Sequence, residues 1–444
     1  MGYAQYKELD SSGVSWLQKK PSHWRIKRLK FSTDLINNKV SVEDSPLPYL
    51  GLEHIESWTG RSIEGEISNS EGLASSFVMG DVLFGKLRPY LAKVHLALQD
   101  GLISSEALVV RSKDELDAEF LKYYMLSRDF INIVDSSTYG SKMPRASWDF
   151  IGNLPVLLPD VEEQKVIARF LDFKTAQIDA LISKKKVLLD KLVEKRTALI
   201  SHAVTKGLDP SGPMKDSGVA WLGDIPVHWT VSKLAYLSES LQTGPFGSQL
   251  HAEEYIEGGV PLINPTDISN GEVLENAKVT VGEDVVERLS RHKLELGDIV
   301  IARRGEMGRA GLVRERNVGW LCGTGSLRAR LNKKALNPEF LLYQFSMRGV
   351  AEYLSLQSVG STMDNLNTSI LGRLPVIAPP LHEQAALVLH LRKLSESIDS
   401  QAAKVGKVIS SLQEYRSALI TNAVTGKVDV RGFAIPQLAE GVAS

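Results

Sequence analysis

The residues best suited to bind a charged ligand form an arginine-rich segment that begins at Arg303 and ends at Arg330. The segment contains seven arginines and no lysine, and glycines such as Gly305, Gly308 and Gly311 separate them. Glycine allows a strand or turn to approach another surface closely, and the planar guanidinium group suits guanine edges and phosphate oxygens. The segment therefore favours nucleic acid as a ligand, and a surface salt-bridge network is the alternative.

Polar loop residues in both halves of the chain extend this set. The segment "YGSKM" (139–143) aligns with "VGSTM" (359–363), so a Gly-Ser tip occurs twice. Such a tip either faces a shared ligand such as DNA phosphate or is a plain turn. The predicted DNA contacts are Lys86, Arg88, Tyr90, Lys142, Arg145, Gln242, Ser248, Gln249, Arg303, Arg304, Arg309, Arg328, Ser361, Thr362, Asn365 and Asn367.

Sequence signatures of catalysis are absent. The stretch "PDVEEQK" (159–165) holds pieces of a nuclease metal site, Asp160, Glu163 and Lys165, but they lie too close together, and the second copy, "PPLHEQA", lacks both Asp and Lys. There is no Walker loop, GxGxxG loop, HExxH motif or Asn-Pro-Pro-aromatic loop. We therefore predict a non-catalytic protein that binds no metal or cofactor itself, and an orphan nuclease using these three residues is an alternative.

Bulk composition limits the class of protein but does not indicate a nucleic-acid partner. The 444 residues carry a net charge of −1, 43% of them are hydrophobic, and the single cysteine, Cys322, excludes an intrachain disulfide. No apolar run approaches the roughly 18 residues of a membrane-spanning helix, so we expect a cytoplasmic protein. Because the net charge is close to zero, a coiled-coil scaffold that bridges two protein clients without DNA is a second hypothesis.

The elements that must position these residues occur twice. "SGVSWLQKKPSHW" (12–24) returns as "SGVAWLGDIPVHW" (217–229), and "EKRTALISHAVTKGLD" (194–209) returns as "EYRSALITNAVTGKVD" (414–429). From residue 154 to 209, 20 of 56 aligned positions are identical, whereas earlier stretches align only at isolated anchors. A repeat this long indicates a duplicated unit, in which a variable globular block precedes a shared helix.

Breaks in the pattern give the domain boundaries. Glycine and proline in "TKGLDPSGPMKD" mark a linker, and Pro159 and Pro379 precede two long helical stretches. The predicted divisions are a first globular block (1–160), a first spacer helix (161–204), a linker (205–216), a second globular block (217–380), a second spacer helix (381–424) and a C-terminal tail (425–444).

Apolar residues in both long stretches recur with a heptad rhythm, which Lys185 and Lys195 interrupt in the first stretch. About 42 residues at 1.5 Å each would give helices of roughly 60 Å. Two helices with matching apolar seams are expected to pair as an antiparallel coiled coil, with one globular block at each end. The predicted seam residues are Ile178, Leu181, Leu188, Leu192, Leu199, Ile398, Val405, Val408, Leu412 and Leu419.

The globular blocks have a mixed pattern. Short apolar runs such as "KVHLAL" and "ISSEALVVR" predict strands, and "AEFLKYYMLSRDFINIV" predicts an amphipathic helix. The second block repeats this order with "DIVIARRG", "GSLRARL" and "PEFLLYQFSMRGVAEYL". The predicted fold class is α+β, with two strand-rich globular domains separated by a pair of long antiparallel coiled-coil helices and an internal pseudo-two-fold repeat.

The order of these motifs resembles that of the specificity subunits of type I restriction-modification systems. The motifs are "LPVLLPDVEEQKVIARFLD" and "LPVIAPPLHEQAALVLHLRK", the paired "SGVxWLxxxPxHW" openings, and "TGPFGSQL" with "GDIVIARRGEMG" in the second block. The resemblance covers essentially the whole chain. It implies that the two blocks are target-recognition domains, each of which recognises one half of a gapped DNA sequence through the major groove.

The same resemblance implies the partners. Two methyltransferase subunits, which carry S-adenosylmethionine and flip the target adenine, would dock on the shared segments. Motor nuclease subunits that use ATP and Mg²⁺ would complete the restriction complex. The shared segments would then bind identical partners, the variable blocks would bind different half-sites, and the spacer helices would separate the half-sites by about one turn of B-DNA, roughly 34 Å.

Overall fold

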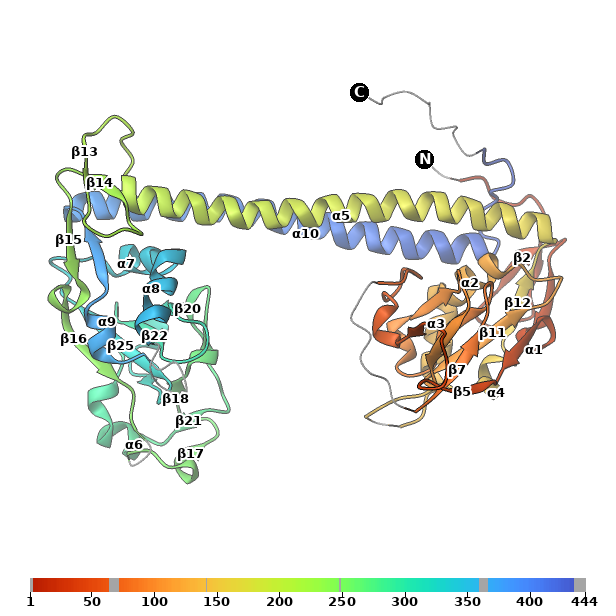
Figure 1. Ribbon diagram of the computed structural model, residues 1–444, viewed down its shortest axis with the longest axis horizontal. Helices are drawn as coiled ribbons and strands as arrows, with labels where there is room; N and C mark the ends of the chain where they lie inside the picture. The colour runs from red at the N-terminus through yellow and green to blue at the C-terminus, as the bar shows by residue number, and fades with distance from the viewer. Residues whose placement is uncertain (1–2, 64–71, 141, 247–248, 359–365, 435–444) are drawn as a thin grey trace. The chain divides into compact units, whose positions relative to one another are not determined.

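The computed structural model describes residues 3–63, 72–140, 142–246, 249–358 and 366–434. The chain forms two compact units (Figure 1). Unit 1 consists of Met1–Lys186 together with Gly406–Ser444, and unit 2 consists of Val187–Val405. Each unit contains one strand-rich block and part of two long helices, α5 (Val161–Lys206) and α10 (Leu381–Val424). The predicted α+β class, with two strand-rich regions and long paired helices, is confirmed.

Unit 1 is built on two four-stranded sheets, one in the order β4-β11-β8-β9 and one in the order β5-β7-β10-β6. Strands β8 and β11 are buried along most of their length because their residues are almost all apolar. The strands are β1 (Leu9–Ser11), β2 (Lys19–Pro21), β3 (Arg25–Arg28), β4 (Thr33–Ile36), β5 (Lys39–Ser41), β6 (Tyr49–Leu50), β7 (Leu73–Phe77), β8 (Val82–Gly85), β9 (Val94–Leu96), β10 (Gly101–Ser104), β11 (Ala107–Ser112) and β12 (Pro155–Leu158). The shorter helices are α1 (Leu29–Ser32), α2 (Ala118–Leu126), α3 (Arg128–Ser136) and α4 (Trp148–Ile151).

Unit 2 contains a six-stranded sheet, β16-β25-β22-β23-β20-β19, and a four-stranded sheet, β17-β21-β18-β24. Strand β25 pairs antiparallel with both β16 and β22, as β11 pairs with β4 and β8 in unit 1. The strands are β13 (Met214–Asp216), β14 (Asp224–Pro226), β15 (Thr230–Lys233), β16 (Ser238–Thr243), β17 (Tyr255–Ile256), β18 (Val260–Ile263), β19 (Ile268–Ser269), β20 (Gly271–Val273), β21 (Thr280–Val281), β22 (Ile299–Ala302), β23 (Ala310–Leu312), β24 (Leu321–Cys322), β25 (Ser326–Leu331) and β26 (Pro375–Ala378). The shorter helices are α6 (Glu283–Arg288), α7 (Pro338–Phe345), α8 (Arg348–Ser358) and α9 (Thr368–Gly372).

A buried aspartate fixes the turn before the central strand in each unit. In unit 1, Asp81 accepts hydrogen bonds from the Val78 amide (2.9 Å) and from Arg111 Nε (2.7 Å). In unit 2, Asp298 accepts them from the Glu295 amide (2.8 Å) and from Arg330 Nε (3.0 Å). Both aspartates follow a glycine with positive φ, a conformation that glycine adopts without strain. The repeated "GD" dipeptide therefore encodes the same turn twice.

A glutamine near the start of each long helix forms a second shared device. The Gln164 side chain accepts from the Asp117 amide at 2.8 Å and donates to the Pro159 carbonyl at 2.9 Å. Gln384 makes the equivalent bonds to the Asn337 amide (2.7 Å) and the Pro379 carbonyl (2.7 Å). Both glutamines are fully buried. Each therefore ties the first turn of a long helix to the helix α2 or α7 of the adjoining block.

The repeated "HW" pair packs against the same helix starts. In unit 1, His23 Nε2 lies 2.8 Å from Glu163 Oε2, and the Trp24 ring is buried. In unit 2, His228 Nε2 lies 2.8 Å from Glu383 Oε1, and Trp229 Nε1 donates to Glu383 Oε2 at 2.9 Å. The repetition of the opening segment is thereby explained in structural terms, since each copy anchors its block to a long helix.

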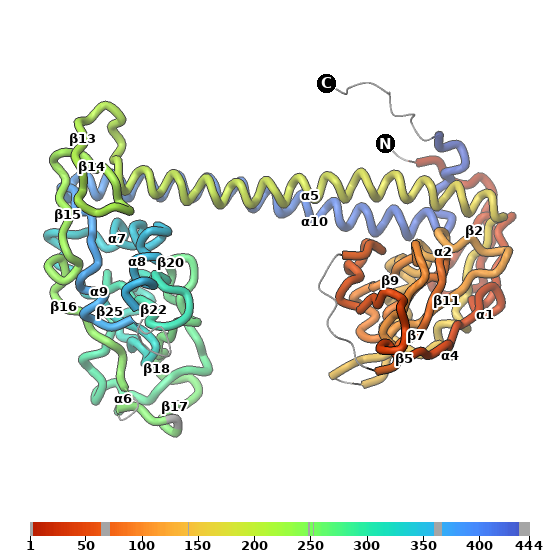
Figure 2. Tube along the Cα trace, in the orientation of Figure 1, coloured from red at the N-terminus to blue at the C-terminus, as the bar shows by residue number. Residues whose placement is uncertain are grey.

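The first and last described segments of the chain meet within unit 1. The Asp429 amide donates to the Ala4 carbonyl at 2.8 Å, and the ring of Phe433 packs edge-to-face on Phe170 with centroids 4.8 Å apart. Tyr3 packs on the other side of this group, with its ring centroid 5.3 Å from that of Phe170. The segment after α10 and the first described residues thus lie together (Figure 2).

The burial pattern corrects the predicted seam. Ile178, Leu192, Ile398 and Leu419 are buried, and Leu199, Val405 and Leu412 are half-buried, but Leu181, Leu188 and Val408 are exposed. The buried or half-buried heptad positions are Leu171, Thr175, Ile178, Ile182, Lys185, Leu189, Leu192, Arg196, Leu199 and Ala203 in α5, and Leu391, Ser395, Ile398, Ala402, Val405, Ile409, Leu412, Arg416, Leu419 and Ala423 in α10.

The error in phase arises because the apolar stripe is two residues wide. Leu181 and Ile182 are both apolar, as are Leu188 and Leu189 in α5 and Val408 and Ile409 in α10. In each of these pairs only the second residue is buried or half-buried. Apolar character alone therefore could not show which member of each pair faces the partner helix.

The two long helices pack against each other in both units. In unit 1, Ile178 and Ile182 of α5 share a core with Leu419 and Ile420 of α10. In unit 2, Ile200 of α5 shares a core with residues of the first turns of α10, among them Leu387 and Leu391. The beginning of each helix thus lies beside the end of the other, as expected for an antiparallel pair. No helix within the described ranges is long and apolar enough to cross a membrane.

Candidate nucleic-acid interface

Two loops of unit 1 lie side by side and carry the candidate contacts of the first block. One follows β8 and contains Lys86 and Arg88, and the other precedes α4 and contains Arg145. The Arg88 amide donates to the Pro144 carbonyl at 2.8 Å, and the Ala146 amide donates to the Lys86 carbonyl at 3.0 Å. The backbone therefore brings together candidates that are about 60 residues apart in sequence.

These loops gather several cations around one carboxylate. Arg145 donates from Nε and Nη2 to the two oxygens of Glu106, at 2.9 and 3.1 Å. This bond lowers the pKa of Glu106, and the positive charges of Lys86 and Lys39 lower it further. Partial burial and the charge of Lys86 lower the pKa of Lys39, which lies on β5. Within the described residues, the site is thus a compact cationic surface around the Glu106 carboxylate.

The first loop presents exposed side chains at its tip. Arg88 is exposed and has a left-handed backbone with φ of 52°, and Ala92, on the far side of a short 3₁₀ turn, has φ of 46°. Left-handed residues other than glycine cost energy and are concentrated at functional sites. Tyr90 on the turn between them is 45% exposed, and Lys142 on the second loop is exposed. The tip therefore offers two cations and an aromatic ring to a ligand.

Unit 2 repeats this backbone arrangement at the corresponding positions. The Leu366 amide donates to the Arg303 carbonyl at 3.0 Å, as Ala146 does to Lys86. The Arg303 amide donates to Gly325 (2.9 Å), as Lys86 does to Glu106. The same two loops therefore meet in both units, although their side chains differ.

Arg303 and Arg328 were predicted to contact DNA, but neither side chain faces solvent. Arg303 is 7% exposed and donates to the Leu366 and Thr324 carbonyls at 3.0 and 3.2 Å. Arg328 is 6% exposed and donates to the Arg291 carbonyl at 3.0 Å. Burial lowers the pKa of both guanidinium groups. Main-chain carbonyl groups bind both arginines inside the fold, although Arg328 Nε has no hydrogen-bond partner, so neither guanidinium group is available as a DNA contact.

Most other arginines of the segment form ion pairs within unit 2. Arg330 pairs with Asp298, Arg309 with Glu306, and both Arg314 and Arg316 with Glu272. The salt-bridge alternative thus describes much of the segment. Arg304 differs, because it is exposed and the structure gives its side chain no partner within the described ranges.

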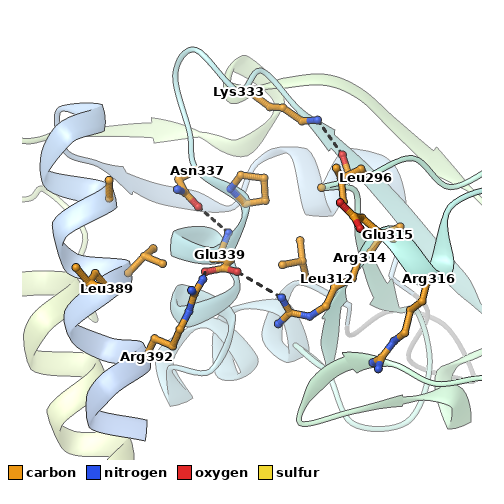
Figure 3. A pocket seen from close by; sticks show the side chains of 15 residues that line it. Leu296, Leu312, Arg314, Glu315, Arg316, Lys333, Asn337, Glu339, Leu389 and Arg392 are labelled. Atoms are coloured by element: carbon orange, nitrogen blue, oxygen red, sulfur yellow. Dashed lines mark hydrogen bonds and ion pairs between the residues drawn. The ribbon is translucent and has the colours of Figure 1, made fainter. Parts of the chain in front are cut away.

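One such network lines an open groove of about 910 Å³ in unit 2. Glu339, in the first turn of α7, accepts from Arg392 of α10 at 2.6 Å and lies 3.5 Å from Arg314 (Figure 3). Leu389, which is 53% exposed, lies on the α10 wall of the groove. These ion pairs join the second block to the long helix α10, so Arg314 has a structural role.

The remaining candidates of unit 2 have mixed positions. Gln242 is half-buried on β16, and Gln249 accepts a hydrogen bond from the Phe246 amide at 3.2 Å. Asn367 caps α9 by accepting from the Ile370 amide at 2.9 Å. Four candidates and both Gly-Ser tips fall wholly or partly outside the described residues; the four are Ser248, Ser361, Thr362 and Asn365.

The nuclease alternative is not supported by the geometry of its three residues. Asp160 accepts from the Glu163 amide at 2.8 Å and so caps α5. The Glu163 carboxylate is buried and bonded to Tyr6 and His23, while Lys165 pairs with Glu162 at the surface. Within the described ranges no group of three acidic, histidine or cysteine side chains could hold a metal ion.

Three residues near the loops were not predicted. Lys39 and Glu106 are isolated charges in sequence, and only the fold places them beside Lys86. Phe246 is 51% exposed, and its ring lies 5.5 Å from the Arg303 guanidinium. An aromatic residue within the glycine- and proline-containing stretch "TGPFG" was the one signal that could have identified it.

Family comparison assigns the fold that carries these loops. The model of the type I restriction modification DNA specificity domain matches residues 77–190 and 226–408, which is more than half of the chain. A solved structure from work on complex assembly and conformational transition of the type I R-M system has a similar fold. Its TM-score is 0.66 at 19% identity, with 92% of this chain and 99% of that chain covered.

Two relatives with similar sequences are named as specificity subunits of type I restriction enzymes. The MjaVIII specificity subunit of Methanocaldococcus jannaschii is 22% identical over 93% of this chain and 95% of its own length. The EcoKI specificity subunit of Escherichia coli K12 is 25% identical over 75% of this chain and 70% of its own length. The duplicated framework, the paired loops and these similarities lead to one conclusion: the chain belongs to the type I restriction-modification DNA specificity family, as a non-catalytic specificity subunit.

Proposed function

We propose that this specificity subunit recognises a gapped, two-part DNA sequence, with one half-site for each strand-rich block. The observation that carries the proposal is the pair of matched loop assemblies, 86–92 with 142–146 in unit 1 and 303–309 with 366–367 in unit 2. Their backbones are held by equivalent bonds, whereas their side chains differ. Equal frameworks with unlike side chains are what two readers of different base sequences require.

The side chains at these loops suit DNA in two ways. Exposed arginine and lysine neutralise phosphates and position a protein on the duplex. Arginine, glutamine and asparagine can also bond base edges in the major groove. We propose Lys86, Arg88, Tyr90, Lys142 and Arg145 for the first half-site. For the second we propose Arg304, Arg309, Gln242 and Gln249, together with Ser248, Ser361, Thr362, Asn365 and Asn367.

The repeated framework also supports a proposal for the partners. The "HW" anchors, the glutamine ties and the beginnings of α5 and α10 are presented once in each unit. Two identical methyltransferase subunits would find the same surface twice, and they would supply S-adenosylmethionine. Motor nuclease subunits would bring ATP and Mg²⁺. A protein that marks host DNA in this way is expected to act in the cytoplasm.

Adenine-methylation sequencing of host DNA tests this function. The chain is co-expressed with the methyltransferase subunit of its own system, and every methylated adenine is mapped. A gapped two-part motif is the expected result. When residues 217–380 are exchanged for the corresponding block of a relative, one half of the motif should change and the other half should remain. A change in both halves, or in neither, contradicts independent recognition.

A further inference from the structure

Among the described residues, Glu106 is the acid that lies with the cations of the unit 1 loops. It directly precedes β11, and its carboxylate accepts from Arg145 Nε and Nη2. The Glu106 side chain is 29% exposed and that of Arg145 is 33% exposed, so both are within reach of a ligand. A carboxylate has about four acceptor positions, so the pair leaves some of them free.

The framework does not need this carboxylate. The main chain already joins the two loops through the bonds of Ala146 and Arg88, and it joins Lys86 to the Glu106 carbonyl at 2.9 Å. Gly325 occupies the corresponding place in unit 2, where the Leu366 and Arg303 amides make equivalent main-chain bonds and the Arg303 side chain also joins the two loops. Unit 2 thus shows that the arrangement of the loops stands without an acid at this position.

A carboxylate is also unfavourable in a surface that serves affinity alone. It repels DNA phosphates, and it occupies the Nε and Nη2 donors of Arg145, while Nη1 lies 3.4 Å from the Met143 carbonyl. Arg145 therefore cannot bond a phosphate through its Nε and Nη2 donors in parallel without leaving Glu106. Charges placed against the wrong ligand are a common source of specificity.

We propose that Glu106 determines base specificity in the first half-site. Its carboxylate accepts a hydrogen bond from the exocyclic amino group of a base in the major groove, either cytosine N4 or adenine N6. Through the same carboxylate, Glu106 holds Arg145 in one orientation, which keeps the guanidinium group off the phosphates until a base edge replaces that contact. This inference rests on the proposed function, and it adds a residue and a ligand group to it.

The test uses the full chain co-expressed with its methyltransferase subunit, with Glu106→Ala and Glu106→Gln compared with wild type. Methylation is measured on duplexes in which each base pair of both half-sites is changed in turn. Glu106→Ala should lose about ten-fold of the discrimination at one position of the first half-site and none in the second half-site. Glu106→Gln keeps one acceptor oxygen and should lose less than Glu106→Ala at that position. The position affected shows whether the amino group belongs to cytosine or to adenine. Binding of Glu106→Ala to unrelated DNA should also strengthen.

Glu115→Gln is the matched control. Glu115 is in the same unit, has a similar exposed fraction of 26%, and pairs with Lys27 at 2.7 Å. This variant should leave discrimination unchanged at all positions. The proposal is overturned if the two Glu106 variants discriminate as wild type does, or if they lose selectivity equally in both half-sites. Absence of a gapped motif with the wild-type chain would instead refute the proposed function, and thermal melting of each variant shows whether it folds.

Discussion

In unit 1, Lys39, Lys86 and Arg145 from three different segments lie around the Glu106 carboxylate, whereas in unit 2 Arg303, which corresponds to Lys86, turns inward to main-chain carbonyl groups. Two of the main-chain bonds that hold the loops have equivalents in both units, the one donated by Lys86 or Arg303 and the one donated by Ala146 or Leu366. The comparison shows that this backbone tolerates either a surface ion pair or a buried cation at its centre. Side chains at the loops can therefore vary without rebuilding the sheets beneath them.

The helix pair differs between the units in a similar way. Arg416 of α10 pairs with Asp179 of α5 in unit 1, where both side chains are less than 10% exposed and Arg416 also donates to the Trp58 carbonyl at 2.7 Å. The equivalent pair in unit 2, Arg196 with Asp399, is 38% and 58% exposed. One pair is covered by a loop of its block and the other is in contact with water, so their energies should differ.

Arg416→Ala should have the largest effect, because it leaves Asp179 buried without its partner. Removal of one member of a buried pair costs about 3–5 kcal/mol, whereas Arg196→Ala at the exposed pair should cost at most about 1 kcal/mol. Hydrogen exchange measured separately for the helices of each unit distinguishes the two losses. If both variants lost the same stability, burial of the Asp179–Arg416 pair by residues 58 and 59 would not strengthen that pair.

Arg303→Ala should destabilise unit 2 by about 2 kcal/mol, since the Leu366 and Thr324 carbonyls would lose a buried donor. Lys86→Ala, at the corresponding place in unit 1, should change stability by less than about 0.5 kcal/mol because Lys86 is half-buried at the surface. Urea unfolding followed by hydrogen exchange measures both. If Lys86→Ala lost more stability than Arg303→Ala, Lys86 rather than Arg303 would be the cation that the fold requires.

Arg304→Ala and Arg88→Ala should leave the melting temperature unchanged and weaken DNA binding, because both side chains are exposed at the loops. Each should reduce the slope of log affinity against log salt by about 1, the expected loss for one phosphate contact. Lys333→Ala is a control, as Lys333 lines the groove of unit 2 and donates to the Leu296 carbonyl at 2.8 Å. A salt slope that stays unchanged in either arginine variant would remove that residue from the interface.

The smallest effect is a pH dependence confined to unit 1. The pKa of Glu106 is lowered from its ordinary value of 4.5, first by Arg145 and then by Lys86 and Lys39. A carboxyl group with a lowered pKa stabilises the fold fully above its unfolded pKa, and this contribution is lost as the pH falls through the folded pKa. Glu106→Gln should therefore reduce the loss of unit 1 stability below about pH 4.5 and leave that of unit 2 unchanged. Melting curves between pH 3 and 7 with hydrogen exchange test this, and an equal change in both units would exclude Glu106 as the cause.

The sequence was sufficient for the fold class because its evidence is repeated and periodic. The duplicated motifs identified the two blocks, and an apolar rhythm over some forty residues identified each long helix. The phase of the seam was less accessible. At Leu181–Ile182, Leu188–Leu189 and Val408–Ile409 two adjacent residues are apolar, and a hydrophobic pattern cannot show which of the two is covered.

The arginine segment shows why the site was harder to predict. Arg330 and Arg111 are alike in sequence context to many surface cations, and their partners, Asp298 and Asp81, lie about 30 residues away in the turn before another strand. A count of arginines cannot separate those that are neutralised in the fold from those that remain exposed, such as Arg304. The loops themselves could be named from their polar residues, but their contact with each other depends on β8 and β22.

The pairs Asp179–Arg416 and Asp399–Arg196 also restrict the lengths that α5 and α10 can have relative to each other. Within each helix the aspartate and the arginine are separated by the same number of residues. A slip of one heptad would keep apolar residues on the seam but would place both aspartates opposite apolar residues. Insertion or deletion of residues between them in α5 alone would break one pair. A change in spacer length is therefore expected to be tolerated only when both helices change together and by whole heptads.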